Sequence, residues 1–242
     1  MGLFAAEGYD RSVAKPFLTA YWGNLLLLNY AVPAAVLEAH LPGGCELDTF
    51  RGSPYLSLVA FQFTRTRVFG FRWPGFTNFP ELNLRFYVRH GGKRGVCFVR
   101  EFVPSGLVAG IARVLYNEPY AKARMSDAVE RRNGEIHARY DLAFRGSSLE
   151  FRATAMDRPH RPAEDSLEHF FKEHDLGVGR SRAGETLTYR VEHPVWRVFP
   201  MKDYFVRVDA ALYGDEFAFL ARATPDSVVL AEGSEIVVYG KD

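Results

Sequence analysis

Residues 81–89 read ELNLRFYVR, a segment in which polar and apolar residues alternate without a break. Successive side chains of a β-strand point to opposite faces, so this pattern predicts a strand with two chemically different sides. The apolar side carries Leu82, Leu84, Phe86 and Val88, and the polar side carries Glu81, Asn83, Arg85, Tyr87 and Arg89. A polar strand face either meets water or lines a pocket inside a barrel, and the segment alone leaves both interpretations open.

The neighbouring segments also have strand patterns. A turn at His90–Lys93 leads into Gly95–Val103, a natural hairpin partner in which Arg100 and Glu101 lie among bulky apolar residues and need partners if buried. Asn133-Gly134 is a strong hairpin signal between two further strands. Additional strands are predicted at 24–32, 54–67, 187–192, 204–209, 216–223 and 227–239.

Three short helices complete the pattern. One covers Pro33–His40, a second begins at the candidate N-cap Ser105, and a third follows Asp165 or Ser166. With about ten strands and mostly antiparallel connections, the sequence predicts the α+β class. The expected architecture is a mostly antiparallel curved sheet or cone-like β-barrel with a few short helices against one end.

Composition narrows the class of protein further. The chain has 242 residues, is 48% hydrophobic and carries a net charge of +1, which excludes a disordered chain and gives no global attraction to nucleic acid or membranes. We expect a single domain over residues 1–242 with a loosely held tail at 1–15. The N-terminus lacks a signal-peptide pattern, and the two cysteines form no disulfide framework, so a cytoplasmic location is expected.

Several common site motifs are absent from the sequence. It contains no glycine-rich phosphate loop, no Gly-x-Ser-x-Gly segment and no Cys-x-x-Cys pair, and its seven histidines are scattered. We therefore expect neither a metal nor a cofactor.

Two further segments contain candidate chemical groups. Lys122 shares a strand face with Tyr120 after the second helix, and only Lys122 and Lys202 of the six lysines are placed to face a core pocket. A lysine in such a pocket is a nucleophile toward carbonyl groups, whereas a surface strand lysine is the simpler interpretation. His193, before Pro194, is either an acid–base group at a pocket mouth or part of an edge strand.

Six segments in order carry a family resemblance over about residues 17–200. They are WGNLLLLNY (22–30), ELDTF (46–50), FPELNLR (79–85), GVCF (95–98), Pro119-Tyr120 and HPVW (193–196). They resemble the YqjF-like family of uncharacterised proteins, placed in the acetoacetate decarboxylase-like superfamily. The resemblance implies a cone-like antiparallel barrel around a small-molecule cavity, with dimers or larger oligomers.

Acetoacetate decarboxylase itself uses a Schiff-base lysine beside a second lysine, with glutamate and arginine nearby. By resemblance, Glu81 matches the glutamate of a cavity-lining strand and Arg113 matches an arginine on the preceding helix. The lysine motif departs, because Tyr120 and Ala121 follow Pro119 and the lysine comes one place later, at Lys122. A one-residue slip turns a strand side chain to the other face unless a bulge restores the phase.

Three functional hypotheses follow. The first is an internal pocket that binds a small anionic or carbonyl-bearing molecule through Arg85, Arg113, Tyr120, Asn83 and Tyr87, together with Glu81. The alternative is a Schiff-base lyase acting on a keto acid, with Lys122 (or Lys202) as nucleophile and Glu81 or His193 moving protons. The third is a non-catalytic interaction module, favoured by an exposed aromatic patch of Trp73, Phe76 and Phe79.

Overall fold

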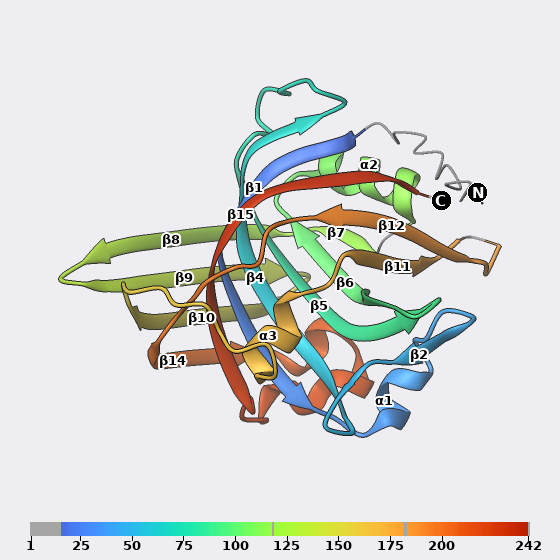
Figure 1. The fold of residues 1–242 in the computed structure, drawn as a ribbon. Helices are drawn as coiled ribbons and strands as arrows, with labels where there is room; N and C mark the ends of the chain where they lie inside the picture. The colour runs from blue at the N-terminus through green and yellow to red at the C-terminus, as the bar shows by residue number, and fades with distance from the viewer. Residues whose placement is uncertain (1–15, 118, 182, 242) are drawn as a thin grey trace, which may run out of the picture.

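A computed structural model describes residues 16–117, 119–181 and 183–241, without the side chains of residues 112–116 and 241. The predicted tail at 1–15 lies outside the described residues. Within them the chain is mostly β-strand with a few short helices, and the strands form two sheets, as Figure 1 shows. The predicted fold class is confirmed.

The larger sheet has 11 strands. They are β1 (Pro16–Ala31), β2 (Cys45–Leu47), β3 (Thr49–Phe50), β4 (Ser53–Val68), β5 (Phe79–His90), β6 (Lys93–Val103), β7 (Tyr120–Lys122), β11 (Leu176–Arg180), β12 (Thr186–Glu192), β13 (Val198–Phe199) and β15 (Ser227–Lys241). The smaller sheet has four strands in the order β14 (Met201–Val208), β10 (Ser147–Met156), β9 (Glu135–Phe144) and β8 (Arg124–Arg132).

The larger sheet curves until its pairing returns to its starting strand. Its central order is β5-β4-β1-β15-β12-β11-β6, and β6 pairs with β5 as well. The β11–β6 contact is parallel and short, joining Leu176 to Gly95 and Gly177 to Val96. This arrangement gives the sheet an inner and an outer face, which is the cone-like shape expected from the sequence.

A bulge between β1 and β4 contributes to the curvature. Asn24 has a left-handed φ of 53° where the register between β1 and β4 shifts, and Gly233 in β15 has a φ of 83°. A Cβ atom at Gly233 would lie 1.9 Å from the carbonyl oxygen of Trp22, so only glycine fits there. Bulges of this kind bend strands and let a sheet wrap around a central space.

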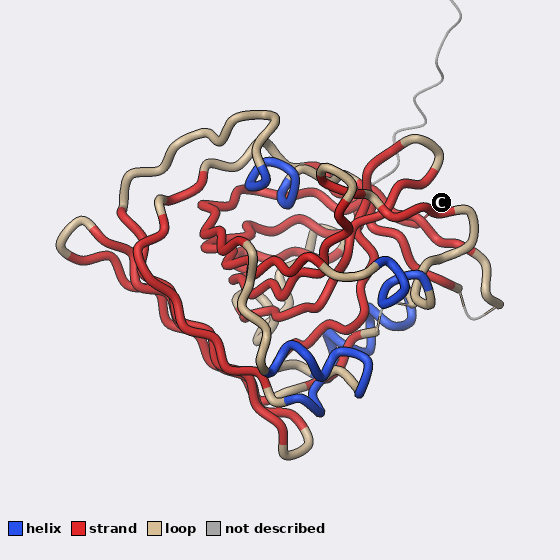
Figure 2. The backbone as a smooth tube through the Cα atoms, turned by 90° about the horizontal axis from the view of Figure 1, so that it is seen from below, coloured by secondary structure: helices blue, strands red, loops and turns tan. Residues whose placement is uncertain are grey.

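Two groups of buried apolar residues lie on the two faces of the larger sheet. The outer face packs against the four-stranded sheet, and this layer includes Leu82, Leu84, Phe86, Tyr140 and Phe151. The inner face holds a second group that includes Leu25, Phe61, Phe63, Phe171 and Trp196. Figure 2 shows the four-stranded sheet edge-on, as a separate layer along one side of the larger sheet.

In the described part of the chain, three α-helices connect the strands: α1 (Ala34–Glu38), α2 (Gly106–Tyr116) and α3 (Leu167–Lys172). The predicted caps are confirmed, because Ser105 Oγ accepts a hydrogen bond from the Val108 amide and Ser166 Oγ accepts one from the His169 amide. No helix in the described part of the chain is long and apolar enough to cross a membrane.

The strand predicted at 216–223 is wrong. That segment forms a 3₁₀ helix, η2 (Asp215–Ala221), after a shorter one, η1 (Ala210–Leu212). Phe217 and Leu220 are buried while Phe219 is partly exposed, a spacing of three that fits the three residues per turn of this helix. Two phenylalanines two residues apart gave a false strand pattern.

Candidate functional site

A cavity of about 730 Å³ lies on the inner side of the curved sheet. This volume falls within the range of about 300–1,000 Å³ that is typical of small-molecule sites. Most of the lining side chains are apolar. The polar and titratable lining residues are Thr66, Glu81, Asn83, Arg85, Glu101, Tyr120, Lys172, His174, Tyr189 and His193.

The alternating strand 81–89 forms one wall of this cavity. Glu81, Asn83 and Arg85 line it, and they are only 3%, 1% and 8% exposed. Leu82, Leu84 and Phe86 point to the opposite side and pack beneath the four-stranded sheet. The polar face of this strand therefore meets an internal cavity instead of bulk water.

Glu81 is the centre of a small hydrogen-bonded group. Its Oε2 accepts a hydrogen bond of 2.9 Å from the Tyr120 hydroxyl, and its Oε1 accepts one of 3.1 Å from Asn83 Nδ2. Burial raises the pKa of Glu81 from 4.5 to about 7, although these two hydrogen bonds and the charge of Arg85 act in the opposite direction. A carboxyl group with this pKa can donate or accept a proton near neutral pH.

Arg85 and Lys172 form a cationic end of the cavity. Arg85 Nη2 donates a hydrogen bond of 3.1 Å to the carbonyl oxygen of Phe171, in α3, and its Nε has no hydrogen-bond partner among the described residues. The next residue in α3 is Lys172, whose ammonium group is fully buried and pairs with Glu173. The charge of Lys172 is balanced by Glu173, so it is the guanidinium of Arg85 that offers donors to an anionic ligand.

His174 lies beside this cationic end. It lines the cavity, and burial, together with the charges of Arg94 and Arg85, holds its pKa well below the usual range. Its ring packs 4.7 Å from that of Tyr87. His174 is therefore a neutral imidazole at pH 7 and adds no third positive charge.

Aromatic rings form a continuous wall along the cavity. Trp22 contacts Trp196 and Phe63 at centroid distances of 6.1 and 5.7 Å, and Phe63 stacks on Phe79 at 4.9 Å. On another side, the Tyr189 ring covers Gly177, where an added Cβ would come within 2.1 Å of the ring. Bulky residues and one glycine thus shape the apolar part of the space.

The apolar lining reaches the protein surface at one end. Phe69 and Trp73, in the loop after β4, and Leu107 and Ile111, in α2, line the cavity and are also exposed. Figure 1 shows α2 and this loop toward the top of the view and α3 lower down. The cavity therefore has an apolar mouth near α2 and a cationic end near α3.

The structure brings together several of the residues named from the sequence. Glu81, Asn83, Arg85, Tyr120 and His193 all line the cavity. Trp73, Phe76 and Phe79, named as a candidate interaction patch, line it as well, so they belong to its wall and mouth. The ring of His193 stacks on Trp196 at 4.1 Å.

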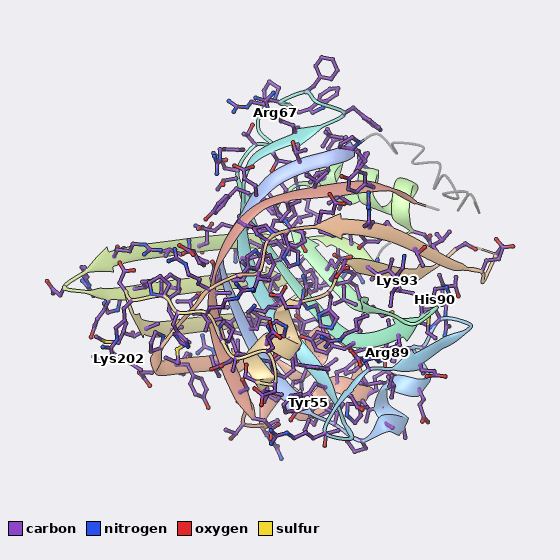
Figure 3. All side chains as sticks on the ribbon, in the orientation of Figure 1. Tyr55, Arg67, Arg89, His90, Lys93 and Lys202 are labelled. Carbon is purple, nitrogen blue, oxygen red and sulfur yellow. The ribbon has the colours of Figure 1, made fainter. Side chains whose placement is uncertain are left out.

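Other named residues lie elsewhere. Lys122 is exposed and is absent from the cavity lining, although it lies only two residues from Tyr120 on β7. Lys202, labelled in Figure 3, lies on β14 in the four-stranded sheet. Its ammonium pairs with Glu135. The expectation that these two lysines face a core pocket is therefore wrong.

The last two residues predicted from the sequence to line the pocket are Tyr87 and Arg113. Tyr87 is buried behind the cavity lining, where its hydroxyl lies 2.7 Å from Ser57 Oγ and its ring packs against Phe170 and Phe171. It supports α3 and is not part of the cavity lining. The side chain of Arg113, on α2, lies outside the described residues.

Sequence reasoning missed Lys172, His174 and the inward position of Glu101. The sequence places Lys172 on a short helix, which ordinarily keeps one side in water. Here α3 is covered on several sides, with Phe170 and Phe171 packed against Tyr55 and Tyr87. The available signal was the density of titratable residues around the Phe-Phe pair, from His169 to His174.

No group of three or more histidine, cysteine, aspartate or glutamate side chains within the described ranges is arranged to hold a metal ion. Cys97 is buried and Cys45 is half-buried, and both are free thiols.

Comparison with protein families identifies the chain at the level of sequence. Residues 19–235 match the family DUF2071, described as an uncharacterized conserved protein, and the chain belongs to this family. It is 31% identical over 164 residues to the uncharacterized protein YqjF of Bacillus subtilis (strain 168). That match spans 63% of this chain and 63% of the relative, which is less than two thirds of its length.

Solved structures share the fold at low sequence identity. The enduracididine biosynthesis enzyme MppR, in complex with pyruvate, has a TM-score of 0.66 at 15% identity, covering 96% of this chain and 92% of that one. An acetoacetate decarboxylase-like enzyme from Sphingomonas wittichii RW1 has a TM-score of 0.64 at 16% identity, covering 95% and 93%. The acetoacetate decarboxylase of Legionella pneumophila has a TM-score of 0.63 at 14% identity, covering 100% and 97%.

Proposed function

We propose that this member of the DUF2071 family binds an organic carboxylate that also carries a carbonyl group, and that Glu81 exchanges a proton with the bound molecule. The observation that carries the proposal is the pairing of Glu81, whose pKa burial raises to about 7, with the buried guanidinium of Arg85 on one strand face inside a cavity. One group suits proton transfer and the other suits anion binding.

The cationic end supplies the binding part of the proposal. A guanidinium has five N–H donors, and Arg85 donates a single hydrogen bond to the described residues, at Phe171. A ligand carboxylate accepts hydrogen bonds from the remaining donors of Arg85, whereas Lys172 is already paired with Glu173. Buried cations without enough acceptors are costly, so an anion in this position stabilises the site.

Glu81 supplies the chemical part. Its ionised carboxylate takes a proton from the carbon next to the ligand's carbonyl group, and the electron pair of that C–H bond moves toward the carbonyl oxygen to form an enolate. Return of the proton from Glu81 restores the starting compound, so the exchange is balanced without a cofactor. The hydrogen bonds from Tyr120 and Asn83 hold the carboxyl group in one orientation for this step.

The structural neighbours are consistent with this ligand class. MppR has been solved with pyruvate and with the condensation product of pyruvate and imidazole 4-carboxaldehyde. The acetoacetate decarboxylases carry a keto acid in their name. Pyruvate and acetoacetate each combine a carboxylate with a carbonyl group. The shared fold by itself fixes no ligand for this chain.

The test combines binding with hydrogen exchange. Keto acids such as pyruvate and acetoacetate are titrated into the protein by calorimetry, and loss of their α-hydrogens in heavy water is followed by NMR. Arg85→Gln is expected to weaken carboxylate binding about ten- to a hundredfold, the range for hydrogen bonds to charged groups. Glu81→Gln is expected to lower the exchange rate at least a hundredfold while binding persists.

Arg89→Gln is the matched control, because Arg89 lies on the same strand, is exposed, and pairs with Asp48 outside the cavity lining. It should leave affinity and exchange unchanged. Equal carboxylate affinity in Arg85→Gln and the parent protein would contradict the binding role. Undiminished exchange in Glu81→Gln would contradict the acid–base role.

A Schiff-base lyase is the second candidate, and the position of Lys172 is the observation that favours it. Of the four lysines with described side chains, Lys93, Lys122, Lys172 and Lys202, only Lys172 lines the cavity. Its amine would add to the ligand carbonyl with loss of water once Glu173 had accepted the ammonium proton. Borohydride reduction in the presence of a keto acid, followed by peptide mass spectrometry, would place the adduct on Lys172 and not on Lys122. Absence of any lysine adduct would exclude this candidate and leave the proton-exchange proposal intact.

A further inference from the structure

We infer that the ligand of this cavity is amphipathic: a carboxylate at the cationic end near Arg85 is joined to a large apolar body that extends along the aromatic wall toward the mouth. This inference rests on the proposed function for its carboxylate and goes beyond it by naming the rest of the molecule. An acyl chain of medium length or an aryl-substituted chain has the required chemistry.

The size of the cavity is the first argument. Its volume of about 730 Å³ is that of a site for a drug-sized molecule. A keto acid of three or four carbons would contact the cationic end and leave most of the apolar wall facing water. Apolar surface inside a cavity is stabilised when an apolar group replaces that water, so the wall favours a longer ligand.

The distribution of polar groups is the second argument. Along β5 the order from the mouth inward is Phe79, then Glu81 and Asn83, then Arg85, whose guanidinium reaches the backbone of α3. At about 3.3 Å per residue, the Cα atoms of Phe79 and Arg85 are about 20 Å apart. A ligand held at Arg85 therefore needs a long body to reach the mouth, and it passes Glu81 on the way.

The exposed apolar side chains at the cavity mouth also favour a ligand with an apolar body. Phe69, Trp73, Leu107 and Ile111 line the cavity and are 62%, 52%, 53% and 37% exposed. Large apolar side chains gathered at one opening mark an interaction site more often than an ordinary surface. Because the same side chains face both the solvent and the cavity, they form an apolar entry path that suits a ligand with an apolar body.

The intrinsic fluorescence of the protein provides the measurement. The chain has three tryptophans, and all of them, Trp22, Trp73 and Trp196, line the cavity. Straight-chain α-keto acids from pyruvate to α-ketododecanoate are titrated while tryptophan emission is recorded, with calorimetry as an independent readout. Each additional buried methylene is expected to tighten binding about fourfold until the apolar space is filled.

Gly110→Phe is the informative variant. Gly110 lies on α2 at the cavity, and a Cβ added there meets no atom within 4 Å, so a larger side chain has room. The phenyl ring would occupy apolar space near the mouth. We expect it to weaken binding of the ten- to twelve-carbon acids at least tenfold and to leave pyruvate affinity unchanged. Gly110→Ala is the control, because it adds a single methyl group and should preserve the whole series.

The outcomes separate this inference from the proposed function. The amphipathic ligand is supported if affinity rises with chain length and if Gly110→Phe weakens binding of the long acids. Binding that is equally strong for pyruvate and the longest acid overturns the inference and leaves the carboxylate site in place. Binding of long-chain alcohols as tightly as the matching acids, or of none of these compounds, overturns the proposed carboxylate site itself and the inference with it.

Discussion

From Glu81 to Phe86, the two faces of β5 are both buried and are chemically opposite. Leu82, Leu84 and Phe86 are fully buried in the layer beneath the four-stranded sheet, whereas Glu81 and Asn83, the neighbours of Leu82, are at most 3% exposed on the other side. An ordinary amphipathic strand would place such polar residues in water. Polar residues that alternate along a strand and yet are buried need hydrogen-bond partners, and Asn83 Nδ2 donates one such bond to Glu81.

Burial on the two faces has different effects on the free energy of the folded state. The apolar face lowers the free energy of the folded state by removing hydrocarbon from water. The polar face holds a carboxyl group against its preference for ionisation and a guanidinium with one hydrogen bond to the described residues. It contributes less to stability, and the raised pKa of Glu81 marks this face as the candidate functional site.

Leu84→Ala should have the largest effect on stability, because it removes a fully buried side chain from the packed face. We expect a loss of about 2–5 kcal/mol in the free energy of unfolding, measured by urea denaturation. Asn83→Ala, one residue away on the cavity side, should cost less, since its side chain borders open space. An equal loss in both variants would break the contrast between the faces.

Comparing Glu81→Gln with the parent protein should show how the buried carboxyl group changes the free energy of unfolding with pH. The pKa of Glu81 is raised from 4.5 in the unfolded chain to about 7 in the folded protein, so between these values the unfolded state has lost a proton that the folded state retains. The stability of the parent protein should therefore fall, relative to Glu81→Gln, by roughly 3 kcal/mol as the pH rises from 4.5 to 7.

The measurement is denaturant unfolding of both proteins across that pH window. Because His174 and the other titrating groups are common to both proteins, their contributions cancel in the difference. A difference that stays constant with pH would mean that Glu81 has an ordinary pKa, and it would remove the main support for its acid–base role.

Tyr87→Phe should have a smaller effect, because Tyr87 belongs to the polar series but lies behind the cavity lining. The variant loses the hydroxyl contact with Ser57 Oγ, which keeps its hydrogen bond to Asn29 Oδ1 at 2.6 Å. We expect a loss of about 1 kcal/mol in unfolding free energy, with ligand affinity unchanged. A large loss of affinity would place Tyr87 in the binding site after all.

Lys122→Ala should have the smallest effect. The residue is exposed and is not part of the cavity lining, so we expect no measurable change in melting temperature, ligand affinity or hydrogen exchange. Lys172→Met is the contrasting variant, because it removes a buried cation from the cavity end. If Lys122→Ala abolished exchange while Lys172→Met did not, the decarboxylase-like role considered for Lys122 would be restored.

Much of the fold could be predicted from the sequence. The alternation at 81–89, the turn at Asn133-Gly134 and the helix caps at Ser105 and Ser166 were all correct, because each depends on the conformational preferences of a few adjacent residues. The error at 216–223 has the same origin, since a spacing of two between phenylalanines suits a strand and a 3₁₀ turn alike.

The candidate site could be predicted only in part. Glu81, Asn83 and Arg85 share a face by strand geometry, and the strand pattern together with the family resemblance predicted that Tyr120 lines the same pocket. Lys172 could not be found, because its position depends on the insertion of α3 beside β5, through contacts such as the one from Arg85 to Phe171, 86 residues away. No local pattern carries information over that separation.

By itself, the sequence determined which side chains share a face of β5, because the two-residue period of a strand is a local property of the backbone. Only the tertiary structure decided that the polar face is enclosed. Pairing of β6 with both β5 and β11, the bulge at Asn24 and the packing of α3 together create the cavity. Burial depends on what long-range contacts bring against a face, and it is burial that raises the pKa of Glu81 and gives this strand its chemistry.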